Sequence, residues 1–288
     1  MHIERPEVAP RDAYTHGHHE SVLRIHSWRT VDNSAAYLAP HLREGAKVLD
    51  VGSGPGTISV DLARRVRPGT VVGVDASSEV VDRANGLARS EGVPNVEFRV
   101  GDAYALDFDD DTFDVVHAHQ VLQHLARPVD AMREWRRVLK PGGLVAARDV
   151  DYGGVIWSPA SVGLTRWLEL YHDVHDWNGG DAHAGRHLKQ WAREAGFHDL
   201  EVSGSTWVFS SALEREWWGG SWAERATEST FAAHAIESGW VQINQGLGQF
   251  PGQSYGGYKQ SGIGREYSLE GMLDSYTQRK SITVNLLR

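Results

Sequence analysis

Apolar residues recur along the chain in two patterns, and the order of these patterns predicts the fold. From residue 45 onward, short apolar runs typical of buried strands alternate with amphipathic stretches of about ten or more residues typical of helices. The predicted strands are 47–51, 70–74, 95–100, 113–118, 143–150, 200–204 and 206–211. The predicted helices are 57–66, 78–90, 128–139 and 184–195. This order predicts an α/β fold with a parallel, doubly wound sheet and helices on both faces.

Segments outside this alternation divide the chain into four parts. Residues 1–44 combine a polar, proline-containing arm with one or two helices that form a cap. Residues 45–211 hold the alternating pattern, which is interrupted at 151–182 by an insertion that we expect to form a lid. A tryptophan-rich helical segment follows at 212–238, and the tail, 239–288, is rich in glycine.

The composition of the chain limits the kinds of molecule that it can bind. The 288 residues include 29 basic and 38 acidic side chains, so the net charge is −9, and there is no cysteine. An acidic chain without a run of Lys or Arg is poorly suited to bind nucleic acid or an anionic membrane. The lack of cysteine excludes disulfides, thiolate metal sites and a cysteine nucleophile. Because the sequence shows no apolar signal segment or membrane span, we expect a cytoplasmic protein with a small-molecule substrate.

A glycine-rich turn, VLDVGSGPGT at 48–57, lies between the first predicted strand and the helix that follows it. Glycine lets the backbone turn tightly and approach a ligand, and the helix start offers free N–H groups to an anion. Asp75 ends the second strand, where a carboxylate can accept both hydroxyls of a ribose. Asp102 follows the third strand, where a carboxylate can reach an exocyclic amine. The turn alone also fits a dinucleotide-binding fold or a structural role, and the ordered set is the stronger signal.

The segments VLDVGSGPG, GVD, GDA, FDVV and LKPGG together resemble the class I S-adenosylmethionine-dependent methyltransferases over residues 45–150. Three further segments extend the similarity over 15–235 to the small-molecule subgroup typical of ubiquinone and menaquinone biosynthesis. These segments are GHHESVLRIHSWRT, NGGDAHAGR and EWWGGSWAER. The resemblance implies a seven-stranded, Rossmann-like sheet with S-adenosylmethionine lying across the carboxyl ends of the strands.

The resemblance also implies roles for individual residues. The three glycines of the turn face the methionine part of the cofactor, Asp75 holds the ribose, and Asp102 with Ala103 flanks the adenine. His119 follows the fourth strand, and Ser53 stands where many family members carry cysteine. The complete expected cofactor site is Asp50, Gly52, Ser53, Gly54, Gly56, Asp75, Ala76, Asp102, Ala103 and His119.

Methyl transfer from a sulfonium depends on proximity and orientation, and a nearby base helps a neutral acceptor to lose its proton. We expect the acceptor beyond the carboxyl ends of the strands. The candidate catalytic residues are His119 and, from an N-terminal cluster of aromatic and imidazole side chains, Tyr14 and His19. The candidate substrate-binding residues are Trp28, His124, Arg148, Asp149 and His172.

The insertion contains a histidine- and aspartate-rich helix. His172, His175 and Asp176 share one face of that helix, a spacing that can bind a metal. A solvated helix face or a hydrogen-bonded lid explains the same spacing, so we expect no metal.

The tail departs from the methyltransferase pattern. IESGWVQIN at 236–244, PGQSYGGYKQSGIGRE at 251–266 and TVN at 283–285 resemble the C-terminal end of an aldehyde dehydrogenase. That chemistry needs a cysteine nucleophile, so the likeness does not make the chain a dehydrogenase. Residues 281–287 have the pattern of a strand with no local partner. We therefore expect a homo-oligomer formed through the tail by strand addition or exchange, with a disordered tail as the alternative.

The sequence thus predicts an S-adenosylmethionine-dependent methyltransferase that modifies a hydroxyl, amine or activated carbon of a small aromatic or polyketide-like molecule. Two alternatives stay open. The same fold and cofactor can support elimination, decarboxylation or dehalogenation with a histidine-activated water, or the chain can be a non-catalytic cofactor-binding oligomer. Formation of S-adenosylhomocysteine in each turnover distinguishes methyl transfer from both.

Overall fold

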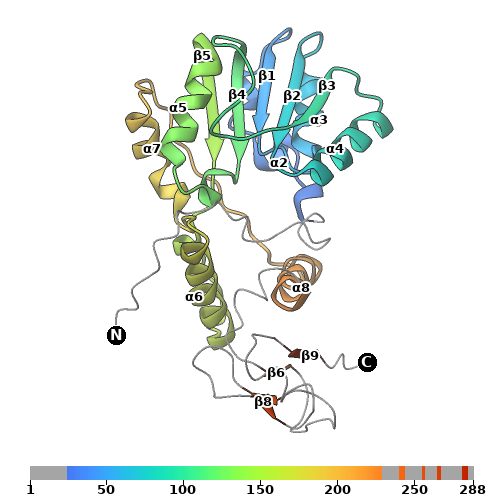
Figure 1. The fold of residues 1–288 in the computed structure, drawn as a ribbon, viewed down its shortest axis with the longest axis vertical. Helices are drawn as coiled ribbons and strands as arrows, with labels where there is room; N and C mark the ends of the chain where they lie inside the picture. The colour runs from blue at the N-terminus through green and yellow to red at the C-terminus, as the bar shows by residue number, and fades with distance from the viewer. Residues whose placement is uncertain (1–24, 229–239, 244–254, 257–264, 267–280, 285–288) are drawn as a thin grey trace. The chain divides into compact units, whose positions relative to one another are not determined.

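The computed structural model describes residues 25–228 and the short segments 240–243, 255–256, 265–266 and 281–284. The chain forms two compact units, Met1–Trp222 and Ala223–Arg288. The first unit contains a central sheet flanked by helices, as Figure 1 shows.

Five parallel strands form the sheet of the first unit, in the order β3-β2-β1-β4-β5 (Figure 1). The strands are β1 (Lys47–Val51), β2 (Thr70–Asp75), β3 (Val96–Val100), β4 (Phe113–His119) and β5 (Leu139–Arg148). The chain runs outward from β1 to β3, then crosses back and lays β4 against the other side of β1. Ligands of open parallel sheets bind at the carboxyl ends of the strands, beside such a reversal. Here the reversal pairs Val51 at the end of β1 with Ala118 near the end of β4.

Helices cover both faces of the sheet. Apolar side chains of α2, α3 and α4 pack on one face, and those of α5 and α7 pack on the other. The helices and 3-10 turns are α2 (Val31–Ser34), η1 (Ala39–His41), α3 (Thr57–Arg65), α4 (Ser78–Ser90), η2 (Leu122–His124), α5 (Pro128–Val138), η3 (Tyr152–Gly154), α6 (Val162–Trp177), α7 (Ala184–Glu194) and α8 (Ala212–Glu228). The predicted α/β fold with helices on both faces is confirmed. Within the described residues, no helix is both long and apolar enough to cross a membrane.

Alternating side chains of β1 enter two separate cores. Val48 packs with Ile58 of α3 on one face, and Leu49 packs with Met132 and Trp135 of α5 on the other. A slip of one residue in the strand register would move each of these side chains to the opposite face. Burial of each large apolar side chain stabilises the fold by roughly 1.5–3 kcal/mol, so the register is strongly specified. The two cores therefore fix the strand register, and with it which residues lie at the carboxyl ends of the strands.

Two of the seven predicted strands are wrong. Residues 200–204 and 206–211 lie in the described part of the chain but pair with no strand of the sheet. Their side chains Val202 and Val208 are 64% and 69% exposed, so these two residues do not pack on a face of the sheet. A side-chain hydrogen bond holds it to β5 instead, because Nη1 of Arg148 donates to the Ser205 hydroxyl at 2.7 Å.

The insertion carries the long helix α6, which packs through aromatic rings. Trp167 and Tyr171 of α6 contact Trp222 of α8, with ring centroids 4.8 and 5.3 Å apart. Tyr152, just before α6, lies 4.2 Å from the Tyr171 ring. These contacts tie α6 to Trp222 of α8 within the first unit.

The second unit contains two short strand pairs. β6 (Trp240–Ile243) pairs in parallel with β9 (Ser281–Val284), and β7 (Tyr255–Gly256) pairs antiparallel with β8 (Arg265–Glu266). The expectation that the strand beginning at residue 281 has no local partner is therefore wrong. The lack of a hairpin turn before it was misleading, because parallel strands are joined by long crossovers rather than hairpins.

Candidate functional site

The glycine-rich turn after β1 has a backbone conformation that residues with a side chain rarely adopt. Gly52, Gly54 and Gly56 have φ angles of 67°, 55° and 86°, in the left-handed region. A Cβ atom at Gly52 would lie 2.4 Å from Val121, and one at Gly56 would lie 2.7 Å from Phe98. At Gly54 the nearest neighbouring atom would be 4.0 Å away, so space is open above this residue. The turn thus packs closely at both ends and leaves its middle accessible to a ligand.

Asp75 fastens this turn to the end of β2. Its Oδ2 accepts a hydrogen bond from the N–H of Gly54 at 3.0 Å, and its Oδ1 accepts from the N–H of Ser77 at 3.1 Å. Asp75 is half-buried, and its neighbour Ala76 is exposed. Ser53 is buried, and its hydroxyl has no hydrogen-bond partner among the described residues. Open space over Gly54, a carboxylate at the next strand end and an unpartnered buried hydroxyl fit a nucleoside-bearing cofactor.

Asp102 and Ala103 follow β3, as predicted. The Asp102 carboxylate is exposed and accepts a hydrogen bond from the N–H of Tyr104 at 2.9 Å. The carbonyl of Ala103 accepts from the indole N–H of Trp135 at 3.2 Å, which anchors this loop to α5. Both residues therefore sit at the carboxyl end of the sheet, with the carboxylate open to solvent.

Asp50 has surroundings unlike those of the other residues of the predicted cofactor site. It is 2% exposed, and its carboxylate lies between Ser59 of α3 and His117 of β4 rather than beside the open space over Gly54. Because β1 alternates its side chains between faces, Asp50 points toward the core under α3.

His119 lies at the end of β4, near the indole rings of Trp207 and Trp28. It is 6% exposed, and neither ring nitrogen has a hydrogen-bond partner among the described residues. The ring of Trp207 lies 6.3 Å away, and Trp28 packs edge-on against Trp207 at 5.6 Å. The indole N–H of Trp207 donates to the carbonyl of Asn33 at 3.3 Å, which fixes that ring. The predicted residues His119 and Trp28 are thus brought together through a residue that the sequence did not indicate.

Burial lowers the pKa of His119 well below its usual value, and the nearby charges of Arg29, His117 and Arg148 lower it further. The imidazole is therefore neutral at neutral pH and has a lone pair available to accept a proton. Arg29 itself is buried, lies 6.0 Å from the Trp207 ring and donates a short hydrogen bond to Oε1 of Gln120.

Gln120 follows β4 directly and carries an uncommon backbone conformation. Its φ angle is 58°, which a residue with a side chain rarely adopts. Its N–H donates to the carbonyl of Arg148 at 2.7 Å, which joins the ends of β4 and β5. Backbone strain of this kind clusters at functional sites, and here it turns the chain just after His119.

Arg148 and Asp149, both predicted to bind substrate, end β5 in different surroundings. The Arg148 guanidinium stacks over the ring of Tyr37 at 4.3 Å. Asp149 is buried, and its Oδ1 accepts from the N–H of Gln123 at 3.1 Å, which secures the turn η2. Burial raises the pKa of Asp149 to about 7, although hydrogen bonds from Gln123 and Leu122 oppose the shift. Its other oxygen has no hydrogen-bond partner among the described residues.

The predicted residues His124 and His172 belong to a separate group around α6. The ring of His124 stacks on His175 at 5.2 Å, and His175 Nε2 lies 2.7 Å from the hydroxyl of Tyr171. Burial lowers the pKa values of all three histidines, that of His175 to about 4. His172 instead lies beside His183, with ring centroids 4.6 Å apart. In the described part of the chain, no group of three His, Cys, Asp or Glu side chains could hold a metal ion.

Two predicted catalytic residues, Tyr14 and His19, lie outside the described residues. The structure adds three residues to the candidate site that the sequence did not single out, namely Arg29, Trp207 and Trp217. Trp217 contacts Trp28 with ring centroids 5.4 Å apart. Arg29 lies within a segment that carries the family likeness, so that segment was the available signal. Nothing local marks Trp207, because its contacts with residues 28 and 33 join distant parts of the sequence.

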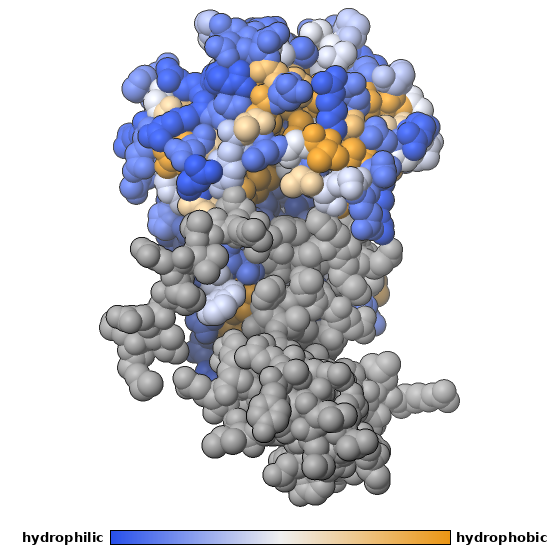
Figure 2. All heavy atoms as spheres, in the orientation of Figure 1, coloured by the Kyte–Doolittle hydropathy of each residue, from blue (hydrophilic) through white to orange (hydrophobic). Residues whose placement is uncertain are grey.

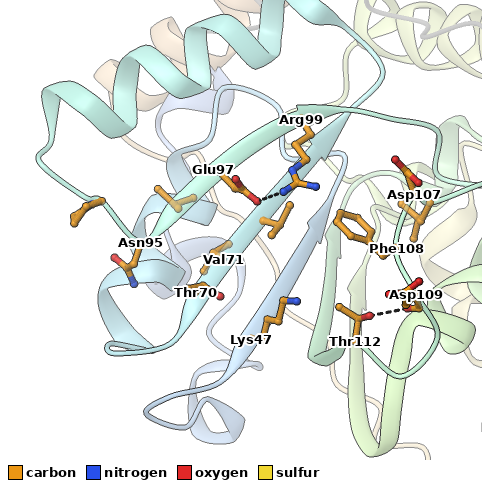
Figure 3. Close-up of a pocket in the computed structure, with 14 residues that line it drawn as sticks. Lys47, Thr70, Val71, Asn95, Glu97, Arg99, Asp107, Phe108, Asp109 and Thr112 are labelled. Carbon is orange, nitrogen blue, oxygen red and sulfur yellow. Dashed lines mark hydrogen bonds and ion pairs between the residues drawn. The ribbon is translucent and has the colours of Figure 1, made fainter.

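A hollow of about 660 Å³ lies elsewhere on the sheet. It is lined by the beginnings of β1 and β2, by β3, and by the loop before β4, as Figure 3 shows for Lys47, Thr70 and Thr112. Its walls are half-exposed and charged, with Arg99 and Glu97 paired at 2.6 Å. Figure 2 shows apolar surface interrupted by hydrophilic side chains on the part of the molecule that bears the sheet. The hollow faces away from the carboxyl ends of β1 and β4 and does not include the glycine-rich turn.

Comparison with known proteins identifies the family. A family model described as a methyltransferase domain matches residues 42–196. An uncharacterized methyltransferase of Schizosaccharomyces pombe is 35% identical over 212 residues, which cover 71% of this chain and 76% of the relative. The chain belongs to the methyltransferase family. This membership confirms the predicted recognition and the predicted cofactor, S-adenosylmethionine.

Two further comparisons concern the methyltransferase part of the chain. A ubiquinone biosynthesis O-methyltransferase of Roseobacter denitrificans is 31% identical over 143 residues, which cover 49% of this chain and 56% of the relative. The crystal structure of an S-adenosylmethionine-dependent methyltransferase from Aquifex aeolicus is 26% identical. That match has a TM-score of 0.41 and covers 49% of this chain and 78% of the other.

A second family model matches the end of this methyltransferase. The aldehyde dehydrogenase family matches residues 218–282, so the predicted likeness of the tail is confirmed. The match begins within α8, earlier than the expected start near residue 236.

Proposed function

We propose that this methyltransferase transfers the methyl group of S-adenosylmethionine to a small, planar aromatic or polyketide-like acceptor. The observation that carries the proposal is His119, which is buried with two unpartnered ring nitrogens beside the indole rings of Trp207 and Trp28. A neutral imidazole can accept a proton, and an aromatic wall favours a flat molecule over a polymer.

The residues present fit the cofactor. The open backbone at Gly54 would hold its methionine part, Asp75 would accept its ribose hydroxyls, and Asp102 with Ala103 would flank its adenine. When bound, S-adenosylmethionine supplies an electrophilic methyl group on a sulfonium. The chain's own contribution is to orient the acceptor against the indoles and to remove its proton at His119.

A direct assay tests this proposal. The protein is incubated with methyl-labelled S-adenosylmethionine and a panel of hydroxylated benzoates, naphthols and polyketide lactones. We expect at least one labelled product, formed in equal amount with S-adenosylhomocysteine. Conversion of an acceptor without consumption of the cofactor would instead show that the site runs a different reaction.

We also propose that the protein is cytoplasmic and assembles as a homo-oligomer through residues 239–288. The two-stranded pairs in the second unit support assembly, since strand pairs this small are marginal alone and their outer edges pair with no other described strand. Truncation after residue 239, followed by light scattering, tests this proposal. An unchanged mass would show that the tail does not hold subunits together.

A further inference from the structure

Arg148 at the end of β5 and His119 at the end of β4 stand directly opposite each other in the parallel register of the two strands. Residues paired in this way project their side chains from the same face of a sheet. Ala146, two residues earlier on β5, packs in the core under α2, α3 and α4, which identifies the face. Burial lowers the pKa of His119, and the nearby charge of Arg148 lowers it further. The guanidinium and the imidazole are therefore neighbours at the carboxyl end of the sheet.

A single segment after α7 contacts both side chains. The Ser205 hydroxyl accepts a hydrogen bond from Nη1 of Arg148 at 2.7 Å, and the ring of Trp207, two residues later, lies 6.3 Å from the ring of His119. Trp28 packs edge-on against Trp207. The guanidinium thus lies at the border of the site that we propose for the acceptor, which His119 and the two indoles form.

The charge of Arg148 has no acidic partner within the described residues. Its guanidinium stacks over the ring of Tyr37 at 4.3 Å and uses Nη1 for Ser205, and both partners are uncharged because burial raises the pKa of Tyr37. Arg148 is half-buried, and its remaining N–H groups bond no other described residue. Arg186 of α7 differs, since its guanidinium pairs with the Asp151 carboxylate at 2.7 Å. Arg148 is therefore a cation held in place with hydrogen-bond donors to spare.

Two carboxyls near this cation are directed elsewhere. Asp50 and Asp149 act electrostatically on Tyr37 together with Arg148, so they are the acidic groups to consider as partners. Asp50 is buried beside Nδ1 of His117 at 2.7 Å, and one oxygen of Asp149 accepts from the turn η2. A planar guanidinium that is fixed by neutral groups and keeps free donors is suited to bind the carboxylate of a ligand.

We propose that Arg148 binds a carboxylate of the methyl acceptor and thereby determines which atom of the acceptor faces His119. This inference rests on the proposed function and narrows its acceptor class to flat aromatic acids. The carboxylate accepts hydrogen bonds from the N–H groups that Ser205 does not use, and the aromatic ring lies against Trp207. A single guanidinium then fixes both the position and the orientation of the acceptor.

A structural role for Arg148 predicts a different result. If this residue served only to fasten the segment at Ser205 and to cover Tyr37, its replacement would weaken the binding of neutral and anionic ligands alike. Loss of the Ser205 hydroxyl would then have a similar effect. Selectivity for the charge of the ligand is therefore the property to measure, because a structural role does not produce it.

The test uses two flat probes of the same shape, 2-naphthoate and its neutral amide, 2-naphthamide. Each is titrated calorimetrically into the full-length protein saturated with S-adenosylhomocysteine, which permits no methyl transfer. We expect the wild type to bind 2-naphthoate at least about tenfold more tightly than 2-naphthamide, because hydrogen bonds between charged groups are the stronger ones. The chain has a net charge of −9, so general electrostatic attraction would not produce this preference.

Three variants locate the source of the preference. Arg148→Gln removes the charge, so it should weaken 2-naphthoate by at least about tenfold and leave 2-naphthamide within about threefold, which also reports an intact site. Ser205→Ala is the matched control and should keep the wild-type preference, because it removes the tie to the segment and retains the guanidinium. Arg148→Lys keeps the charge without the planar fork and should recover part of the preference.

A wild type that does not bind 2-naphthoate, or that binds the two probes equally, would overturn the inference, and this result requires no variant to fold. Equal losses for both probes in Arg148→Gln would overturn it too, because they indicate a structural role. Titration of the same wild-type sample with S-adenosylhomocysteine separates these outcomes from a failure of the proposed function. Lack of cofactor binding would defeat the proposed function, whereas cofactor binding without any charge preference would defeat this inference alone.

Discussion

Two regions of the sheet differ in shape and in the state of their polar groups. The hollow along the beginnings of β1 and β2 has a volume of about 660 Å³, and its charges are solvated and paired, as in Glu97 with Arg99 (Figure 3). At the carboxyl ends of β4 and β5, by contrast, His119 and Asp149 are buried with polar atoms that have no partner among the described residues. Desolvated and unsatisfied groups are costly to keep, so they indicate function better than empty volume does.

The largest expected effect of this difference is on stability. Burial raises the pKa of Asp149 to about 7, whereas an unfolded Asp titrates near about 3.9. Its stabilising contribution is full below about pH 4 and is lost as the pH rises through about 7, by at most about 4 kcal/mol. Asp149→Asn should therefore unfold at a higher urea concentration than the wild type at pH 8, and more than half of this advantage should be lost at pH 5.

Asp107→Asn, which changes a carboxyl in the wall of the hollow, is the control for this experiment. Because Asp107 is exposed, this variant should unfold at about the same urea concentration as the wild type at pH 8. If the free energy of unfolding depends on pH equally in the wild type and in Asp149→Asn, the buried carboxyl at the end of β5 does not destabilise the fold at high pH, and the contrast with the hollow fails.

Asp75→Ala should weaken S-adenosylmethionine binding by on the order of a hundredfold, because two charge-assisted hydrogen bonds to the ribose are lost. The variant also loses the bond that Asp75 accepts from Gly54, so circular dichroism should confirm an intact fold. Calorimetry measures the affinity. An unchanged dissociation constant would mean that the glycine-rich turn binds something else.

His119→Gln should lower the rate of methyl transfer by at least about tenfold while cofactor affinity stays within about twofold, because the variant removes a base but keeps a polar side chain of similar size beside the cofactor. Burial lowers the pKa of His119, so the wild-type rate should rise with pH only in the acidic range and level off by neutral pH. Rates measured between pH 5 and 9 with the acceptor found in the panel test this. Full activity in His119→Gln would show that His119 is not the base, and positioning of the acceptor would then be the only contribution of the site.

Trp207→Ala should raise the Michaelis constant for an aromatic acceptor by about tenfold, which corresponds to the loss of one ring contact. Trp207→Phe should recover most of this loss, because a ring remains. The affinity for S-adenosylmethionine serves as the internal control and should change little. Equal effects on the cofactor and the acceptor would place Trp207 outside the acceptor site.

The smallest effect is expected in the hollow. Glu97→Ala removes an ion pair whose side chains are both about half exposed, so the free energy of unfolding should change by less than about 0.5 kcal/mol. Cofactor affinity should not change. A weaker cofactor affinity would contradict the assignment of the site to the opposite end of the sheet.

Local sequence patterns predicted those features of the fold and site that depend on residues close together in the chain. The strand and helix order, the turn at Gly52–Gly56 and Asp75 all follow from alternation and from glycine's backbone freedom, and the structure contains them. Contacts between distant segments were not predictable in this way. The placement of Trp207 depends on contacts of an unpaired segment with the distant residues Trp28 and Asn33. The turning of Asp50 into the core depends on its partner His117 in another strand.

The most direct test of the central claim is to locate the transferred methyl group on the protein. S-adenosylmethionine carrying a 13C-labelled methyl group is bound to the full-length protein, and isotope-filtered nuclear Overhauser effects are recorded from that methyl group to aromatic protons. The account predicts contacts to the rings of His119 and Trp207 and none to Phe108 in the hollow. Contacts to Phe108, or bound cofactor without any contact to His119, would contradict it.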